Sequence, residues 1–230
     1  SEPVRPLGVI IGGSKVKDKI GVLRTLITKA DTIIIGGRMA FTFLAALGTE
    51  VGQTQIEEDW LGPAREMVEA ATARGVKLYL PRDVLVSSSL DAAKDLHTVN
   101  MSRGCCTKAS PCVPAGHFGV DIGPQSCVDV VEEIKACKTL FWNGPMGKYE
   151  VPDFSNGTTA VAKAFASASE AGAITIIGGG DSVAAINQMG LASKMTHIST
   201  GGGASLELIE GKNMPGLRCL AGLCGPDCKS

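Results

Sequence analysis

The sequence is poor in aromatic residues and carries almost no net charge. Aromatic residues make up 4% of its 230 residues, too few for a platform on which nucleic-acid bases stack. The formal net charge is −1 at pH 7, so there is no overall basic field to attract nucleic acid or an anionic membrane. No apolar run approaches the ~20 residues that a membrane-spanning helix needs. We therefore expect neither nucleic acid nor a membrane among its partners.

The sequence also lacks the short motifs of several common enzyme classes. It has no G-x-x-x-x-G-K-[ST] loop, no His-Arg-Asp catalytic loop, no G-x-S-x-G turn and no H-E-x-x-H pair. The histidines His97, His117 and His197 are scattered, without a nearby nucleophile or metal partner, which predicts surface or core roles. Neither a signal-peptide pattern nor a peroxisomal address is present. The start of the chain resembles a cut or joined end just before a strand.

Cysteine, by contrast, is frequent, with eight residues. Cys127 and Cys137 stand apart, and the others form two groups: Cys105, Cys106 and Cys112, then Cys219, Cys224 and Cys228. Zinc sites use paired C-x2-C spacings, which both groups lack. Disulfide frameworks are typical of small secreted chains. We predict free intracellular thiols, with redox control through the tail group and a structural zinc site as the alternatives.

Apolar runs of strand length alternate with amphipathic helix patterns along most of the chain. Strands are predicted over residues 7–11, 32–35, 76–80, 83–86, 139–142, 173–177 and 196–199. Helices are predicted over residues 16–28, 39–47, 57–73, 126–136, 157–169, 181–189 and 204–210. Residues 87–118 are predicted to be a long irregular surface excursion. This alternation predicts an α/β fold with three layers, a mostly parallel sheet with helices on both faces, Rossmann-like.

Glycine-rich turns follow five of the predicted strands. They are Gly12-Gly13, Gly36-Gly37, Asn143-Gly144-Pro145-Met146-Gly147, Gly178-Gly179-Gly180 and Gly201-Gly202-Gly203. The carboxyl ends of parallel strands share one edge, where helix N-termini direct free N–H groups at a ligand. One such turn could use glycine for steric reasons alone. Several on one edge predict a nucleotide cleft.

Charged residues accompany two of these turns. Lys15 and Lys19 are four residues apart and would suit a polyphosphate, the alternative being a solvated lysine face. Asp181 follows Gly180 at a predicted helix start. A carboxylate there is either an N-cap or a ligand of a phosphate-bound Mg²⁺, and the two roles are compatible.

These motifs resemble those of the phosphoglycerate kinases. The matching segments are Gly12-Gly13-Ser14-Lys15-Val16, Asp121-Ile122-Gly123-Pro124, Trp142-Asn143-Gly144-Pro145, Gly178-Gly179-Gly180-Asp181-Ser182 and His197–Glu207. They follow the order of the family and cover nearly the whole chain to Leu217. The resemblance implies one nucleotide-binding domain over residues 1–217, the family's C-terminal domain, followed by a cysteine-containing tail over residues 218–230.

The resemblance also implies an activity and a missing part. Family members transfer a phosphoryl group reversibly between 1,3-bisphosphoglycerate and ADP in glycolysis. Their N-terminal domain, which binds 3-phosphoglycerate, has no counterpart here, so the isolated chain is expected to be inactive. Mg-ADP or Mg-ATP is the implied ligand. We expect a monomer in the cytoplasm, or alternatively a plastid or other organelle form.

Individual roles follow from the motifs that match. Lys15 would stabilise the phosphoryl group in flight, together with the backbone amides of Gly179, Gly180, Gly202 and Gly203. Lys19 and Ser182 would hold phosphates, and Asp181 the Mg²⁺. The remaining contacts would be Asn143 and Pro145 at phosphate and ribose, Glu150 at a ribose hydroxyl, and Gly13, Ser14, Gly37, Leu90 and Val120 around the adenine.

Four residues depart from the family pattern around the adenine slot. Arg38 stands where a glycine or alanine is usual, Gln55 and Lys148 replace apolar neighbours, and Ser14 replaces alanine. Polar substitutions in an apolar pocket predict weakened or altered nucleotide binding. Arg38 could fill the slot or stack on the base. The alternative function is a non-catalytic nucleotide-binding or regulatory module with redox-sensitive cysteines.

Overall fold

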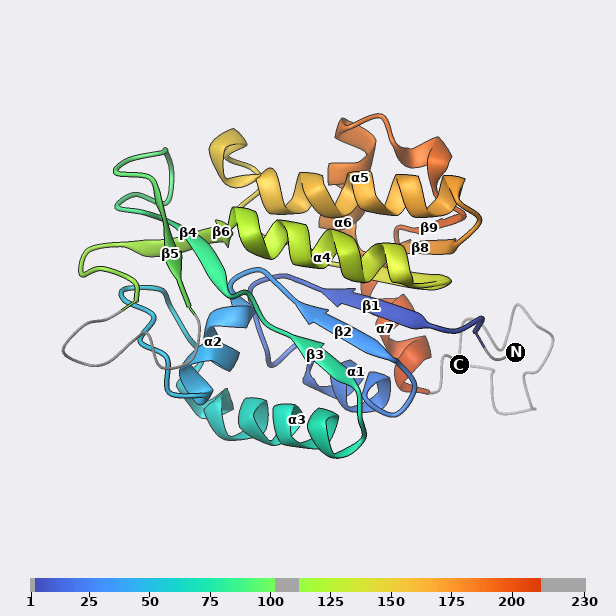
Figure 1. Cartoon of the computed structure of the whole chain (residues 1–230), viewed down its shortest axis with the longest axis horizontal. Helices are drawn as coiled ribbons and strands as arrows, with labels where there is room; N and C mark the ends of the chain where they lie inside the picture. Colours follow the sequence, from blue (N-terminus) through green and yellow to red (C-terminus); the bar gives the residue numbers. More distant parts are fainter. Residues whose placement is uncertain (1–2, 102–111, 212–230) are drawn as a thin grey trace, which may run out of the picture.

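The larger of two sheets forms the centre of the molecule. The computed structural model describes residues 3–101 and 112–211. Six parallel strands lie in the order β3-β2-β1-β7-β8-β9 (Figure 1). They are β1 (Leu7–Ile11), β2 (Thr32–Ile35), β3 (Lys77–Tyr79), β7 (Thr139–Asn143), β8 (Ile174–Gly178) and β9 (His197–Ser199). The predicted α/β fold with a mostly parallel sheet is confirmed.

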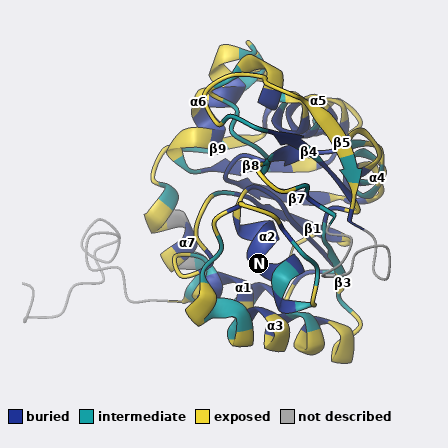
Figure 2. Cartoon of the chain, turned by 90° about the vertical axis from the view of Figure 1, so that its left-hand side faces the viewer, coloured by how far each residue is buried: buried dark blue, intermediate teal, exposed yellow. Residues whose placement is uncertain are grey.

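Helices cover both faces of this sheet. One face carries α1 (Ile20–Leu26), α2 (Met39–Ala46), α3 (Leu61–Ala73) and α7 (Gly202–Glu210), and the other α4 (Pro124–Ala136), α5 (Asn156–Glu170) and α6 (Gly180–Gln188). Side chains alternate along β1, so Val9 and Ile11 enter one core while Ile10 enters the other beside Trp142. Figure 2 shows the strands buried between helices whose outer surfaces are exposed. Burial on both faces explains the unbroken apolar runs of these strands.

Two helices begin later than the sequence pattern predicts. The helix expected from residue 57 is a 3₁₀ turn over Glu58–Trp60 followed by α3 from Leu61. Pro63 has no N–H and its ring disfavours a preceding helical turn, so it fits the first turn of α3 and not a helix interior. The helix expected from residue 16 begins at Ile20, after a turn in which the N–H groups of Lys19 and Ile20 both donate to the carbonyl of Val16.

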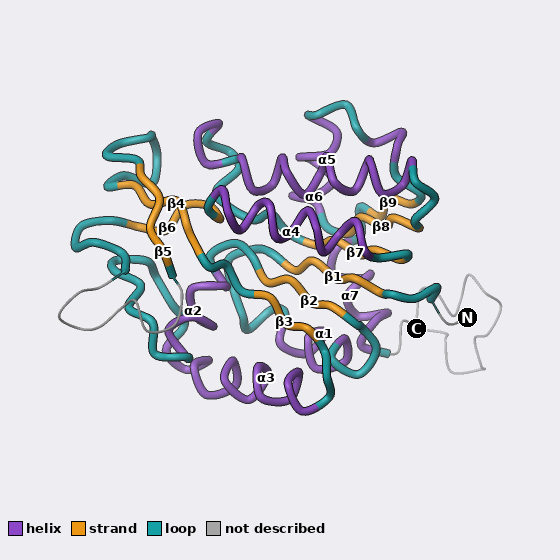
Figure 3. The backbone as a smooth tube through the Cα atoms, in the orientation of Figure 1, coloured by secondary structure: helices purple, strands orange, loops and turns teal. Residues whose placement is uncertain are grey.

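A second, antiparallel sheet occupies part of the segment that we expected to be irregular. It has the order β5-β4-β6, from β4 (Asp83–Ser87), β5 (His97–Asn100) and β6 (Phe118–Ile122) (Figure 3). The expectation of an irregular excursion over residues 87–118 is therefore wrong for β5 and the start of β6. The sequence of β5 has no apolar alternation, because three of its four residues are exposed. Its pairing with β4 holds it in place.

This second sheet also brings together two of the three histidines. His97 pairs with Val86 on one side of β4, and Phe118, next to His117, pairs with Ser87 on the other. The imidazole ring centroids of His97 and His117 are 5.1 Å apart, with the rings inclined at 72°. Strand pairing thus brings these two rings together although 20 residues separate them in the sequence, and the exposed position of His97 agrees with the surface role expected for it.

The cysteines differ in state among the described residues. Cys127 is half-buried and Cys137 is buried, and both are free thiols as expected. Burial raises the pKa of Cys127 to about 12 and that of Cys137 to about 11, which makes both thiols unreactive. Cys112 is disulfide-bonded, contrary to the free thiol expected there. The other cysteines, with the predicted tail over residues 218–230 and the boundary at Leu217, lie outside the described residues.

Within residues 3–101 and 112–211, no helix is both long and apolar enough to cross a membrane.

Candidate functional site

The candidate site lies where the order of the parallel strands reverses. From β1 the chain continues to β2 on one side, while β7 lies on the other, and such a switch point opens a crevice at the carboxyl ends of the strands. Backbone hydrogen bonds join the turns around this crevice to one another. The N–H of Gly12 donates to the carbonyl of Asn143 at 2.9 Å and that of Gly13 to the carbonyl of Pro145 at 3.1 Å. The N–H of Gly37 donates to the carbonyl of Met146 at 2.9 Å.

Close backbone approach explains two of the glycines. A Cβ on Gly12 would lie 2.0 Å from the carbonyl oxygen of Pro145. A Cβ on Gly202 would lie 2.5 Å from the Cα of Gly179, because the starts of α6 and α7 approach each other there. Only glycine permits both contacts, so these residues set the spacing of the turns.

Two adjoining pockets open along this crevice and share Gly13, Ser14 and Asp181. The first, which we call the apolar pocket, has a volume of about 400 Å³. Its lining from the predicted site comprises Gly13, Ser14, Gly37, Leu90, Val120, Pro145, Glu150 and Asp181. The second, the glycine pocket, has a volume of about 370 Å³. Its lining comprises Gly13, Ser14, Lys15, Lys19, Asn143, Gly179, Gly180, Asp181, Ser182, Gly202 and Gly203. Every site residue predicted from the sequence thus lines one pocket or both.

A partly buried polar pair lies in the glycine pocket. The ammonium group of Lys19 donates to Oδ1 of Asn143. Burial lowers the pKa of Lys19, while the nearby charges of Asp18 and Asp181 raise it. Nδ2 of Asn143 is buried and has no hydrogen-bond partner among the described residues. A Cβ added to Gly179 would lie 3.0 Å from this Nδ2 atom. A buried donor without an acceptor is destabilising, so this part of the pocket favours an oxygen atom that the described residues do not supply.

Two helices direct their N-termini at the same pocket. The first residues of α6 and α7, Gly180 and Gly202, both line it. No side chain caps the N-terminus of α6, so its first N–H groups remain available. The positive ends of the helix dipoles add to the charge of Lys19. An anion is therefore the ligand that this pocket favours.

The hydroxyl of Ser182 has a structural contact. Ser182 is buried, and its Oγ accepts a hydrogen bond of 2.6 Å from the N–H of Gly144. This bond ties the start of α6 to the turn after β7. Ser182 thus fixes the relative position of two turns that line the glycine pocket.

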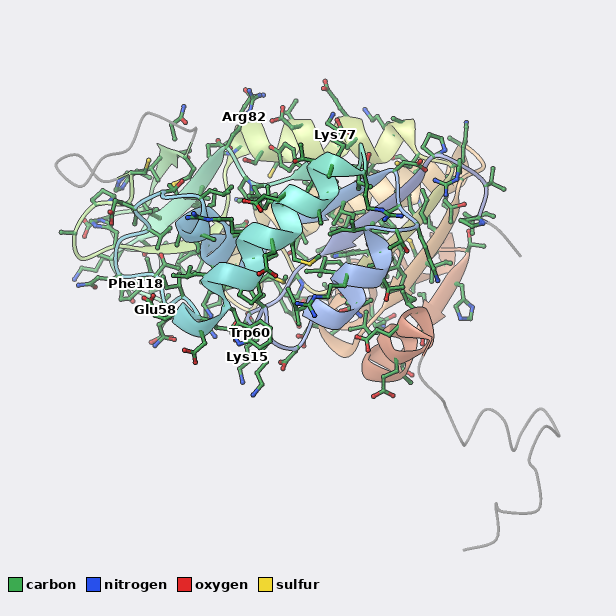
Figure 4. All side chains as sticks on the ribbon, turned by 90° about the horizontal axis from the view of Figure 1, so that it is seen from below. Lys15, Glu58, Trp60, Lys77, Arg82 and Phe118 are labelled. Atoms are coloured by element: carbon green, nitrogen blue, oxygen red, sulfur yellow. The ribbon has the colours of Figure 1, made fainter. Side chains whose placement is uncertain are left out.

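Lys15 lies at the exposed mouth of the glycine pocket and extends away from the fold (Figure 4). Its loop is held by Glu57, whose carboxylate accepts the N–H of Val16. The N–H of Glu57 in turn donates to Oγ1 of Thr42 at 3.2 Å. Sequence reasoning did not identify Glu57, because no local pattern links it to a residue 41 positions away.

Asp121 lines the apolar pocket, although we predicted no role for it from the sequence. It is 2% exposed. Its carboxyl group accepts hydrogen bonds from the N–H of Gly157 at 2.7 Å and of Ile122 at 2.9 Å. Burial raises the pKa of Asp121 to about 7, and the backbone hydrogen bonds oppose this shift. Asp121 thus stabilises the start of α5 beneath the pocket.

The residues that depart from the family pattern lie around the apolar pocket without filling it. Nη1 of Arg38 donates to Oε1 of Gln55 at 2.9 Å, and Nε of Arg38 lies 3.4 Å from the carbonyl oxygen of Ser14. Nζ of Lys148 donates to the carbonyl of Leu90 at 2.8 Å and to Asp91 at 3.0 Å. A volume of about 400 Å³ remains open beside these side chains. Arg38 therefore does not fill the slot, which was one of the two arrangements expected from the sequence.

Asp181 is the carboxylate that both pockets share. It is exposed and lies in the first turn of α6. Among the described residues, no group of three histidine, cysteine or acidic side chains could hold a metal ion. A cation at Asp181 would therefore take most of its ligands from a bound molecule or from water, as Mg²⁺ commonly does beside phosphates.

Comparisons with known proteins agree with this architecture. The family model for phosphoglycerate kinase matches residues 1–212. The phosphoglycerate kinase of Synechococcus sp. (strain JA-3-3Ab) is 50% identical over 95% of this chain and 51% of its own length. That of Clostridium novyi (strain NT) is 49% identical over 95% of this chain and 52% of its own length. The chain thus spans about half the length of the curated relatives that it matches.

Solved structures show the same likeness. The structure of phosphoglycerate kinase from Coxiella burnetii matches with a TM-score of 0.83 and 37% identity, over 91% of this chain and 52% of that one. The structure of the kinase from Pyrococcus horikoshii OT3 matches with a TM-score of 0.77 and 28% identity, over 95% and 52% of the two chains.

Proposed function

The chain belongs to the phosphoglycerate kinase family, and we propose that it is the part of such a kinase that binds the nucleotide. In this proposal residues 1–217 form one domain, equivalent to the family's C-terminal domain, and residues 218–230 form a tail. The domain binds Mg-ADP or Mg-ATP. The whole enzyme transfers a phosphoryl group reversibly between ADP and the carboxyl phosphate of 1,3-bisphosphoglycerate.

The observation that carries this proposal is the unpartnered amide of Asn143. Its Nδ2 donor is buried beside the ammonium group of Lys19, in a pocket to which two helix N-termini also contribute. A phosphate oxygen would satisfy that donor and both positive fields at once. The adjoining apolar pocket is the place for the base and ribose.

Each pocket then has a defined task. The base lies among Gly13, Gly37, Leu90 and Val120, and the ribose near Pro145 and Glu150, all of which line the apolar pocket. The phosphates occupy the glycine pocket. Asp181, at the junction of the two, would hold the Mg²⁺ of the nucleotide, which neutralises charge on the phosphates when bound.

Phosphoryl transfer depends mostly on positioning and on charge stabilisation. Lys19 is held by its hydrogen bond to Asn143, and the N–H groups of Gly180 and Gly203 are oriented by the starts of α6 and α7. They can therefore receive developing negative charge with little rearrangement. Lys15, exposed at the mouth of the pocket, would stabilise the phosphoryl group during its transfer.

The second reactant requires another domain in this proposal. 3-Phosphoglycerate would bind to the half of the enzyme that this chain does not cover, so the chain alone lacks one reactant's site. We propose a monomer in the cytoplasm, or a plastid or other organelle form, from the family alone. A non-catalytic regulatory module is not favoured, because the residues proposed to contact phosphate line one pocket and relatives named as kinases are about half identical in sequence.

Reconstitution tests the proposal. The half of the Synechococcus relative that this chain does not match is produced separately and mixed with this chain, 3-phosphoglycerate and Mg-ATP, and ADP release is measured. We expect transfer only in the mixture, and none with a Lys19→Met variant. If the partner half binds 3-phosphoglycerate and the mixture is nevertheless inactive, the assignment of this chain as the catalytic nucleotide half is wrong.

A further inference from the structure

Arg38 and Gln55 give one wall of the apolar pocket an unusual chemistry. Both residues line the pocket and are exposed at its rim. Arg38 lies between Gly37, which has a φ of 66°, and the start of α2. The two side chains are joined by the 2.9 Å hydrogen bond from Nη1 of Arg38 to Oε1 of Gln55. Gln55 thus holds the guanidinium group at the rim of the apolar pocket, which the proposed function assigns to the base.

The donors and acceptors on this wall are unbalanced. A guanidinium group has five N–H donors and no acceptor. Two of its nitrogens, Nη1 and Nε, face Gln55 and Ser14, whereas Nη2 has no hydrogen-bond partner in the described part of the chain. Oε1, the only side-chain acceptor of Gln55, already accepts one hydrogen bond from Arg38, and the amide of Gln55 adds two further N–H donors. The nearby Oγ1 of Thr54 already accepts the N–H of Gly119 at 2.9 Å.

Purine bases differ in the hydrogen-bond donors and acceptors that their edges would present to such a wall. Adenine offers the acceptor N7 beside a donor, its 6-amino group. Guanine and hypoxanthine offer two acceptors, N7 and O6, and a forked arginine recognises that pair with two hydrogen bonds. Facing Arg38, the amino group of adenine would meet a second donor.

We propose that Arg38, positioned by Gln55, makes this pocket select nucleoside diphosphates with a 6-oxopurine base over ADP. The proposal rests on the proposed nucleotide-binding function and refines its substrate class. A well-formed bidentate contact discriminates between bases by about 5- to 150-fold. Because Arg38 lies at an exposed rim, we expect the lower part of that range, about 5- to 10-fold.

Calorimetric titration with Mg-IDP and Mg-ADP tests the proposal, since the two ligands share ribose and phosphates. For the native chain we expect a dissociation constant about 5- to 10-fold lower for Mg-IDP. Arg38→Ala should bring the two constants together by weakening Mg-IDP alone. Arg38→Lys should do the same, because an ammonium group keeps the charge but not the fork. Gln55→Leu should reduce the preference partly, through loss of positioning.

The control is Arg82→Ala, which removes an exposed arginine that pairs with Asp129 outside both pockets. It should leave the ratio of the two constants unchanged. The inference is overturned if native chain binds Mg-ADP as tightly as Mg-IDP, or if Arg38→Ala keeps the ratio. If neither nucleotide binds, the proposed function fails as well, so the two failures are distinguishable.

Discussion

Asn143 binds Lys19 through Oδ1 and leaves its own Nδ2 buried without an acceptor among the described residues. The two residues come from different elements, the end of β7 and the loop before α1. Their contact fixes an ammonium group and an amide donor on the same wall of the glycine pocket. An anionic oxygen beside Nδ2 would accept its hydrogen bond, and without such an oxygen this buried donor stays unpaired.

The depressed pKa of Lys19 predicts proton uptake when a nucleotide binds. Burial lowers this pKa in the free chain, and phosphate charge beside the ammonium group would raise it. At alkaline pH, binding of Mg-ADP should therefore take up protons, and the affinity should fall as pH rises through the depressed pKa. Calorimetry in two buffers with different heats of ionisation measures the uptake. Equal uptake by native chain and Lys19→Met would contradict this role.

Glu57 should act on catalysis through the loop of Lys15. Its carboxylate accepts the N–H of Val16, next to Lys15. In the reconstituted assay, Glu57→Ala should lower kcat about tenfold and change the KM for Mg-ATP little, since a lost hydrogen bond to a charged group is worth about 1.5 kcal/mol or more. Glu58→Ala is the matched control, because Glu58 is exposed next to it (Figure 4). Equal kcat values for the two variants would exclude a positioning role for Glu57.

Gly202→Ala should separate the starts of α6 and α7. The new Cβ would lie 2.5 Å from the Cα of Gly179, which is backbone and cannot move aside cheaply. We expect a lower melting temperature and at least about tenfold weaker binding of Mg-ADP, because misaligned N–H groups lose hydrogen bonds to charged oxygens. Gly201→Ala is the control, since its Cβ would meet nothing closer than 3.6 Å. The steric argument fails if both variants melt and bind alike.

The raised pKa of Asp121 predicts how stability depends on pH. Burial raises this pKa from 3.8 to about 7, so between these values the folded chain holds a proton that the unfolded chain has released. The free energy of unfolding should therefore fall as pH rises through this window, by about 2.6 kcal/mol between about pH 5 and about pH 8. Denaturant unfolding at both pH values measures the change.

Asp121→Asn should remove this part of the pH dependence, because the amide does not titrate. It should also lower the stability by about 1–3 kcal/mol at the lower pH, because an amide N–H₂ group would face backbone donors. Asp153→Asn, at an exposed position, should keep the native slope. The same slope in Asp121→Asn and native chain would show that Asp121 titrates normally.

The sequence was sufficient to predict the parallel sheet and the group of glycine turns that lines the crevice. Buried strands such as β1 and β7 are unbroken apolar runs, and glycine turns mark their carboxyl ends. Once the strands are parallel, topology alone brings distant turns such as Gly13 and Pro145 to one edge. The predicted site therefore assembled even though its residues come from turns far apart along the chain.

What the sequence did not predict depends on single tertiary contacts. The strand β5 is mostly exposed and lacks apolar alternation, so only its pairing with β4 reveals it. The bond from Val16 to Glu57 and that from Arg38 to Gln55 join side chains and loops without any periodic pattern. The role of Asp121 follows from complete burial beneath a pocket, which composition does not encode.

The most direct test of the account is calorimetric titration of the native chain, Asn143→Asp and Asn143→Ala with Mg-ADP. Asn143→Asp keeps the acceptor for Lys19 and replaces the unpartnered donor by a negative oxygen. We predict saturable one-site binding by the native chain and at least about tenfold weaker binding by both variants. Asn187→Asp, at an exposed position of α6, should bind like the native chain. No binding by the native chain, or equally tight binding by Asn143→Asp, would contradict the assignment of this pocket to phosphate.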